Sequence, residues 1–279
     1  MLYLKLKQTS KIIIVFVLFL LYGCKKEVKT DNDTKTTSDV IWATIVYNDV
    51  FTQIDAIFKN NVLLTKDSIT SERYGCVVVS KKFDTIFPKI YLLDFGGSNC
   101  QGSDSRYRRG RIYLSFSNYY SRPGTIVNVS FVNYYVNDCK VEGAYSIQVE
   151  QNIDLSENII YNIRIQGGSI LTSTGRIFYS GTFAREFVGG QNTEYPILND
   201  DVYQINSLSV KGTSANVEDF TAVLGSPLKY YNNCGWFIGG VLLVNIYSRE
   251  QRVVTFNSNI CSNIANVNIS GKDYSLTLR

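Results

Sequence analysis

The chain has 279 residues, of which 45% are apolar and 19% are charged, and its formal net charge is +4. This length is sufficient to bury a large hydrophobic core. The chain contains no histidine, which excludes catalytic triads with a histidine base, histidine-ligated zinc and the usual proximal haem ligand. We therefore expect neither a cofactor nor a metal ion.

Residues 1–23 are predicted to be a lipoprotein signal peptide. Three lysines precede an uninterrupted apolar run of eleven residues, 12–22. A membrane-spanning helix needs roughly 20 apolar residues, whereas the core of a secretory signal is shorter. The run ends in Leu21-Tyr22-Gly23-Cys24, which resembles the lipobox of bacterial lipoproteins and implies cleavage before Cys24 and a lipid on Cys24. An ordinary signal peptide is the alternative.

Removal of the signal peptide changes the charge balance and bears on the partner. Without its three lysines the chain has 25 basic and 24 acidic residues, whereas nucleic-acid binding domains are strongly basic, so no nucleic acid is expected. Lys25 follows Cys24 in place of the aspartate that retains lipoproteins in the inner membrane of enteric bacteria. Lys25-Lys26-Glu27 resembles the surface-export signal of Bacteroidota lipoproteins. We expect a lipid-anchored protein of the outer membrane that faces the cell surface, with the periplasmic orientation as the alternative.

The next two segments are predicted to be a flexible tether, residues 24–37, and a helix, residues 38–60. The tether is polar and has no apolar periodicity. Ser38 and Asp39 are suited to cap the helix. Apolar residues then recur at helical spacing as far as Phe58, so this helix is expected to pack against the rest of the chain.

After residue 61 the apolar residues alternate with polar ones, as in Ile112, Leu114 and Phe116. Turn residues recur about every ten positions, a spacing typical of β-sandwiches. We predict an all-β fold of tandem β-sandwich-like units preceded by one N-terminal α-helix, with units at 61–153 and 154–279. The predicted strands lie near 75–80, 89–95, 112–117, 127–132, 140–150, 158–166, 175–185, 201–211, 236–247, 252–258, 264–270 and 273–278.

The cysteines suggest two disulfides. Cys76 and Cys100 flank a strand, a turn and a second strand, and Cys234 and Cys261 flank a similar arrangement. Compartments beyond the inner membrane permit disulfides, so we predict these two pairs and a single Cys139. The alternative is that all five cysteines are buried thiols. Without a histidine base, Cys139 is not expected to be a nucleophile.

A dense motif carries a family resemblance. It combines Asp94-Phe95-Gly96, Cys100 and Arg108-Arg109-Gly110-Arg111, and later Gly239-Gly240 lies between Cys234 and Cys261. The pattern resembles a family of Bacteroidota outer-membrane lipoproteins with tandem β-rich units. The resemblance implies a lipid-anchored β-rich protein and no established activity, so it assigns no catalytic residue.

Two groups of residues are weak candidates for ligand binding. Arg106, Arg108, Arg109 and Arg111 form a basic cluster that is suited to bidentate contacts with an anionic glycan or a phosphate. The alternative role is protection of an exposed strand edge. Tyr119 and Tyr120 end a strand and offer aromatic faces for sugar rings, although tyrosine is also simply a good strand former.

No set of catalytic residues emerges, so we do not expect an enzyme. The favoured function is non-enzymatic binding or adhesion, with a glycan or matrix component as the partner besides the membrane that holds the lipid of Cys24. The alternative is a structural partner of another envelope protein. A carbohydrate-active enzyme that uses acid pairs such as Asp200-Asp201 or Glu218-Asp219 is less favoured.

Overall fold

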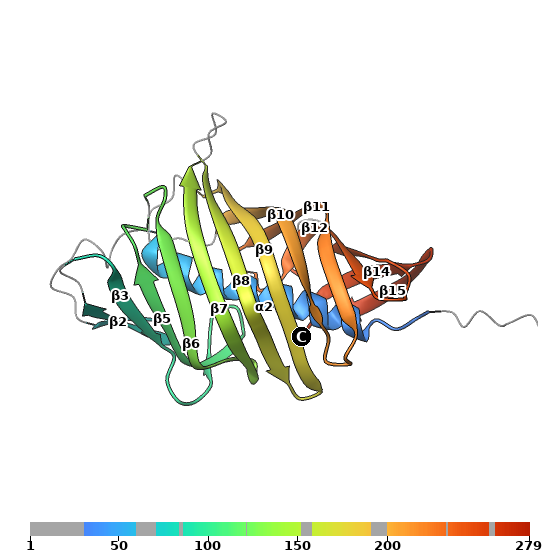
Figure 1. The fold of residues 1–279 in the computed structure, drawn as a ribbon, viewed down its shortest axis with the longest axis horizontal. Coiled ribbons are helices and arrows are strands. Elements are labelled where there is room, and N and C mark those ends of the chain that lie inside the picture. The colour runs from blue at the N-terminus through green and yellow to red at the C-terminus, as the bar shows by residue number, and fades with distance from the viewer. Residues whose placement is uncertain are drawn as a thin grey trace, which may run out of the picture. The chain divides into compact units, whose positions relative to one another are not determined.

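The computed structural model describes residues 31–59, 71–83, 86–120, 122–151, 158–190, 200–232, 234–256 and 260–279. The predicted signal peptide, Cys24 and most of the predicted tether lie outside these residues. Asp33–Arg279 forms one compact unit. This unit contains one helix and one large antiparallel sheet (Figure 1).

The strands follow one another in the sheet in nearly the same order as in the chain. Each strand pairs antiparallel with its neighbours in the chain, with one exception. Strand β3 pairs with β5, and the two-residue β4 pairs with the first residues of β5. The strands are β1 (Ser71–Tyr74), β2 (Val77–Phe83), β3 (Lys89–Asp94), β4 (Cys100–Gln101), β5 (Tyr107–Phe116), β6 (Ile126–Val136), β7 (Cys139–Gln151), β8 (Ile159–Thr172), β9 (Gly175–Gly189), β10 (Val202–Thr213), β11 (Asp219–Tyr231), β12 (Phe237–Ile246), β13 (Arg252–Phe256), β14 (Ile264–Ile269) and β15 (Lys272–Thr277).

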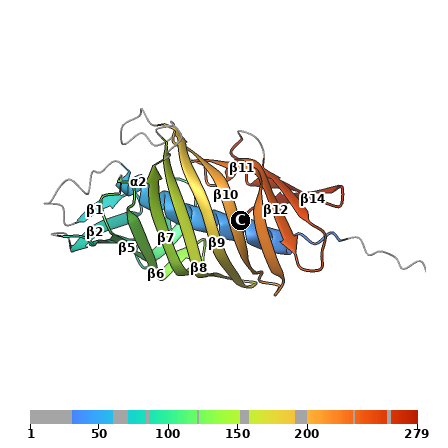
Figure 2. The same ribbon diagram turned by 45° about the horizontal axis from the view of Figure 1, so that its top comes forward.

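Helix α2 (Lys35–Phe58) crosses the strands on one side of the sheet, and the sheet curls around it (Figures 1 and 2). Twenty of its 24 residues are buried, whereas a helix at the surface of a domain buries only one face. The inner side chains of the sheet and those of the helix form one hydrophobic core. The helix is therefore the centre around which the sheet is built.

The start of the helix differs from the prediction. The helix begins at Lys35, whose amide donates to Asp33 Oδ1 over 2.9 Å, so the predicted tether 24–37 ends earlier and the predicted cap at Ser38 and Asp39 is wrong. Asp39 lies inside the helix, and its carboxylate accepts the amide of Ala215 over 3.0 Å. A residue type that favours a cap thus serves here to join the helix to the sheet.

The all-β class with one preceding helix is confirmed, but the arrangement of the strands differs from the predicted tandem sandwiches. The boundary predicted between 153 and 154 falls between β7 and β8, which pair along almost their whole length from Lys140 to Gln151. The two predicted units are consequently parts of one sheet. Alternation of apolar and polar residues predicts that one face of each strand is covered, but it does not predict what covers that face. In this structure α2 covers it, instead of a second sheet.

Strand β11 was not among the predicted strands. Its centre contains Gly225-Ser226-Pro227, which is typical of a turn. In the structure these residues form an irregular, bulged section, because the register with β12 shifts on both sides of Ser226. A bulge tolerates proline, which has no amide hydrogen to give to the ladder.

Both predicted disulfides are confirmed. Cys76 bonds to Cys100 and Cys234 bonds to Cys261, each pair with a Cα–Cα distance of 5.7 Å, which lies in the usual range. The first joins the β1–β2 turn to β4, and the second joins the approach to β12 to the approach to β14. Cys139, at the start of β7, is a free thiol.

Replacing Cys234 and Cys261 together by alanine is expected to lower the free energy of unfolding by about 3 kcal/mol, because the bond closes a loop of 27 residues in the unfolded chain. Guanidinium denaturation of the oxidised protein measures this change. Cys139→Ser is the control and should have a much smaller effect. Equal stability of the double variant and the unsubstituted protein would contradict the prediction.

Candidate functional site

The interior contains a cluster of four buried charged residues between α2 and β5. Arg108 donates to both carboxylate oxygens of Asp49, over 2.6 and 3.1 Å, and also binds Asp104. Arg106 lies 3.6 Å from Asp49, donates to the carbonyl of Gly235 and lies over the ring of Trp236. Burial alone would raise the pKa of Asp104, but the hydrogen bond and positive charge of Arg108 lower it overall.

A second polar cluster lies one and a half turns further along the helix. The hydroxyls of Tyr120 and Tyr203 both donate to the carboxylate of Asp55, and complete burial raises the pKa of this acid. Arg185 is fully buried and donates to Asn48 Oδ1 over 2.7 Å. Its guanidinium lies 4.0 Å from the ring centre of Tyr203, an arrangement that stabilises a cation by its contact with an aromatic face.

These clusters connect the helix to the sheet. In them, buried acidic and basic side chains form contacts with one another. Within the described ranges no group of three side chains is arranged to hold a metal ion. No helix in the described part of the chain is long and apolar enough to cross a membrane. Since α2 packs against the inner face of the sheet, the outer face is the one that a ligand can approach.

The predicted arginine cluster is divided between the two faces of β5. Arg106 and Arg108 are only 2% exposed and belong to the interior, so they do not form part of a basic surface, contrary to the expectation. Arg109 and Arg111 point outward and pair with Asp138 and Asp94. The cause is the period of two along a strand, which places alternate residues on opposite faces.

The two predicted tyrosines are also separated. Tyr120 is buried against Asp55, as described above, so it is a core residue and is closed to ligands. Tyr119 is 36% exposed, and its ring packs edge-on against Phe87. The side chains of Lys89 and Arg122 lie over the same ring, 5.2 and 5.3 Å from its centre. Of the two, only Tyr119 is accessible.

One row of residues across the outer face of the central strands is polar and carries a single charge. Successive register partners from β6 to β10 form one row across the sheet, and all but one of them are short and neutral. The row consists of Asn128, Ser146, Arg164, Thr182 and Ser209. Hydroxyl and amide groups both donate and accept hydrogen bonds, so the row is suited to a partner that is rich in hydroxyls.

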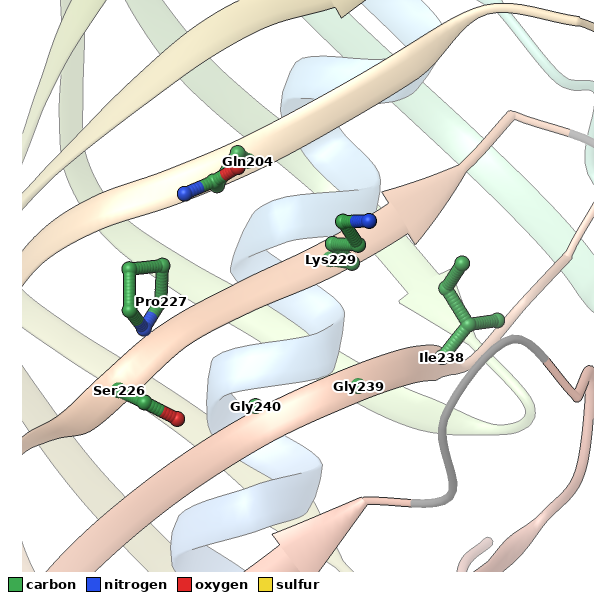
Figure 3. Close-up of a pocket in the computed structure, with 7 residues that line it drawn as sticks. All are labelled: Gln204, Ser226, Pro227, Lys229, Ile238, Gly239 and Gly240. Carbon is green, nitrogen blue, oxygen red and sulfur yellow. The ribbon is translucent and has the colours of Figure 1, made fainter.

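An open pocket of about 290 Å³ lies on strands β10, β11 and β12. Its polar groups are the amide of Gln204 on β10 and the hydroxyl of Ser226 and the ammonium of Lys229 on β11, and Gly239 and Gly240 lie on the adjacent strand β12 (Figure 3). The remaining lining residues are Pro227 and Ile238. Gln204, Lys229 and Gly239 are neighbours across the three strands.

The bulge of β11 and the glycines of β12 produce this pocket together. Gly240 has a φ of +101°, and a Cβ atom at this position would lie 2.2 Å from the carbonyl oxygen of Pro227. Only glycine allows this close approach of β12 to the bulge. Gly239 is buried and Gly240 is half-buried, so the groups that a ligand can reach here are the half-buried Gln204 and Ser226 and the exposed Lys229.

Lys229 is the charged residue among those that line the pocket. It is exposed and forms no ion pair with any other residue that the structure describes. The neighbouring acid, Glu186, is the register partner of Gln204 and accepts hydrogen bonds from Asn158 and Asn206 instead. The ammonium of Lys229 thus keeps its three donors for a ligand or for water.

No protein-family model, curated protein or solved structure matches this chain. Sequence reasoning named Gly239 and Gly240 only as part of a resemblance and missed Gln204, Ser226 and Lys229. The available signal was the pair of sequences Gly225-Ser226-Pro227 and Gly239-Gly240, since breakers on two consecutive strands indicate a bulge beside a close backbone approach.

Asp49→Asn is expected to lower the free energy of unfolding by about 3–5 kcal/mol, because it leaves the buried cations Arg108 and Arg106 without a full counter-charge. Urea denaturation at pH 7 measures the loss. Asp138→Asn is the matched control, since it removes the same charge from an arginine pair at the surface, and it should have a much smaller effect. Similar losses for the two variants would contradict the structural role of the interior cluster.

Proposed function

We propose that this protein is a lipid-anchored, non-enzymatic binding protein of the outer membrane, displayed on the cell surface, that binds a glycan through the outer face of its sheet. The observation that carries the proposal is the pocket at Gln204, Ser226 and Lys229. It combines an amide, a hydroxyl and an exposed ammonium that forms no ion pair with any other described residue, on the outer face of the sheet.

The anchor rests on the lipobox ending at Cys24, and the disulfides support the same location. Two bonded pairs, Cys76–Cys100 and Cys234–Cys261, fit a compartment beyond the inner membrane, where disulfides persist. Several acyl chains on one cysteine provide a durable attachment. The protein body then lies outside the membrane, where its outer face is accessible to a partner.

The chemistry of the pocket favours a hydroxylated ligand. Binding sites for small molecules combine a few well-placed polar groups with apolar surface, and here the exposed Pro227 supplies the apolar part. The volume of about 290 Å³ lies at the lower end for ligand pockets, which suits one unit of a longer glycan. The row from Ser209 to Asn128 crosses the same face, starting five residues further along β10 than Gln204, and provides hydrogen-bonding groups for further units.

The acids that an enzyme would need are occupied by contacts of the fold. Asp201 is buried and pairs with Lys59 over 2.8 Å, Glu218 pairs with Arg249, and Asp219 accepts the hydroxyl of Thr213. These contacts favour binding over hydrolysis as the proposal. The second candidate, a structural partner of another envelope protein, uses the same outer face but requires a protein on it.

Glycan-array binding of the full chain, followed by titration of the strongest ligand, tests the proposal. Lys229→Ala is expected to weaken binding about tenfold or more, because hydrogen bonds to charged groups contribute about 1.5–3 kcal/mol each. Lys211→Ala, an exposed lysine on the same face of β10, is the control and should leave affinity unchanged.

Two outcomes would contradict the proposal in different ways. If glycans bind but Lys229→Ala has no effect, the pocket is not the site. If no glycan binds and crosslinking in cells captures an envelope protein at Lys229, the structural-partner alternative replaces the glycan.

A further inference from the structure

Two turns of the sheet hold the segment through which the chain arrives from Cys24. Arg249, in the turn between β12 and β13, lies 3.6 Å from the carboxylate of Asp33. Thr36 donates to Ser214, in the turn between β10 and β11, and also binds Glu218 at the end of that turn. The first described residues before α2 are thus fixed beside these two turns.

The same two turns carry the most exposed apolar side chains of the described structure. Val217 is 83% exposed and Tyr247 is 82% exposed. The turns are joined to each other, because the amide of Tyr247 donates to the carbonyl of Asp219 over 3.0 Å. We refer to Val217 and Tyr247 as the apolar tips. Isolated exposed apolar residues are common, but here both tips flank the point where the anchored segment joins the fold.

The backbone conformation at Val217, like its exposure, is unfavourable for valine. Its φ is 62°, in the left-handed region that β-branched residues rarely adopt. Glycine or asparagine would fit this turn with less strain. Neither burial nor backbone conformation therefore explains a valine at this position, and such a combination points to a contact outside the fold.

We propose that the apolar tips dock into the surface of the lipid bilayer that holds the anchor. This inference rests on the proposed lipid at Cys24. Asp33 is nine positions after Cys24, and a fully extended chain of that length spans at most about 32 Å, so the two turns cannot lie far from the membrane. Tyrosine favours the boundary between headgroups and acyl chains, and a valine beside it adds apolar surface.

Docking at the apolar tips orients the rest of the molecule. Strand β10 starts near the pocket at Gln204 and ends at Thr213, immediately before the turn that carries Val217. Nine residues of strand correspond to about 30 Å. The pocket is therefore held away from the bilayer, on the side where an external glycan would approach.

Depth-dependent quenching in reconstituted vesicles tests the docking. The full-length lipoprotein carrying Val217→Trp or Tyr247→Trp is reconstituted into vesicles of phosphatidylethanolamine and phosphatidylglycerol, with or without dibrominated phosphatidylcholine. The emission of the unsubstituted protein, which contains Trp42 and Trp236, is subtracted. The control is Ile86→Trp, an equally exposed apolar position at 78% in the connection between β2 and β3.

We expect both tip variants to show a shift to shorter wavelength and a loss of emission with brominated lipid, and the Ile86 variant to show neither. If the protein floats with the vesicles but aqueous iodide quenches both tip positions as strongly as position 86, the docking is overturned while the anchor stands. If the protein does not float with the vesicles, the anchor fails and the docking falls with it.

Discussion

The structure depends on the burial of a helix that carries three carboxylates inside a single curled sheet. At 3.6 residues per turn, Asp39, Asp49 and Asp55 point in three different directions around α2, and all three are buried. Burying a carboxylate is unfavourable unless the protein supplies hydrogen bonds or an opposite charge. The sheet supplies a different partner in each direction: the amide of Ala215, the arginine pair of β5, and the hydroxyls of two tyrosines.

These partners of the helix are far apart in the chain. Arg108 belongs to β5, Tyr203 to β10, and Ala215 to the turn after β10, so the helix is bonded along much of the sheet. Removing one member of a buried ion pair leaves an uncompensated charge, so the loss of such a contact destabilises the packing of the helix in the sheet. The outer face has no such constraint and is free to carry a binding surface.

The sequence predicted those features that depend on local pattern. Alternating residues such as Ile112, Leu114 and Phe116 predicted strands, and the repeated spacing of the cysteines predicted both disulfides. Two failures have physical causes. The arginine cluster was read as a surface, although strand alternation sends Arg106 and Arg108 inside, where only the folded structure reveals Asp49. Strand β11 was missed because Gly225-Ser226-Pro227 is the same signal for a turn and for a bulge, and that bulge forms the pocket.

The proposed function follows from the division between a closed interior and an open exterior. Hydrogen exchange followed by mass spectrometry tests this division most directly, because amides in a central helix exchange only when the whole unit unfolds. The account predicts that peptides of α2 are the slowest to exchange, slower than those of the edge strand β15. Exchange in α2 as fast as in β15 would contradict it, since it would show that the helix leaves the sheet while the strands remain folded.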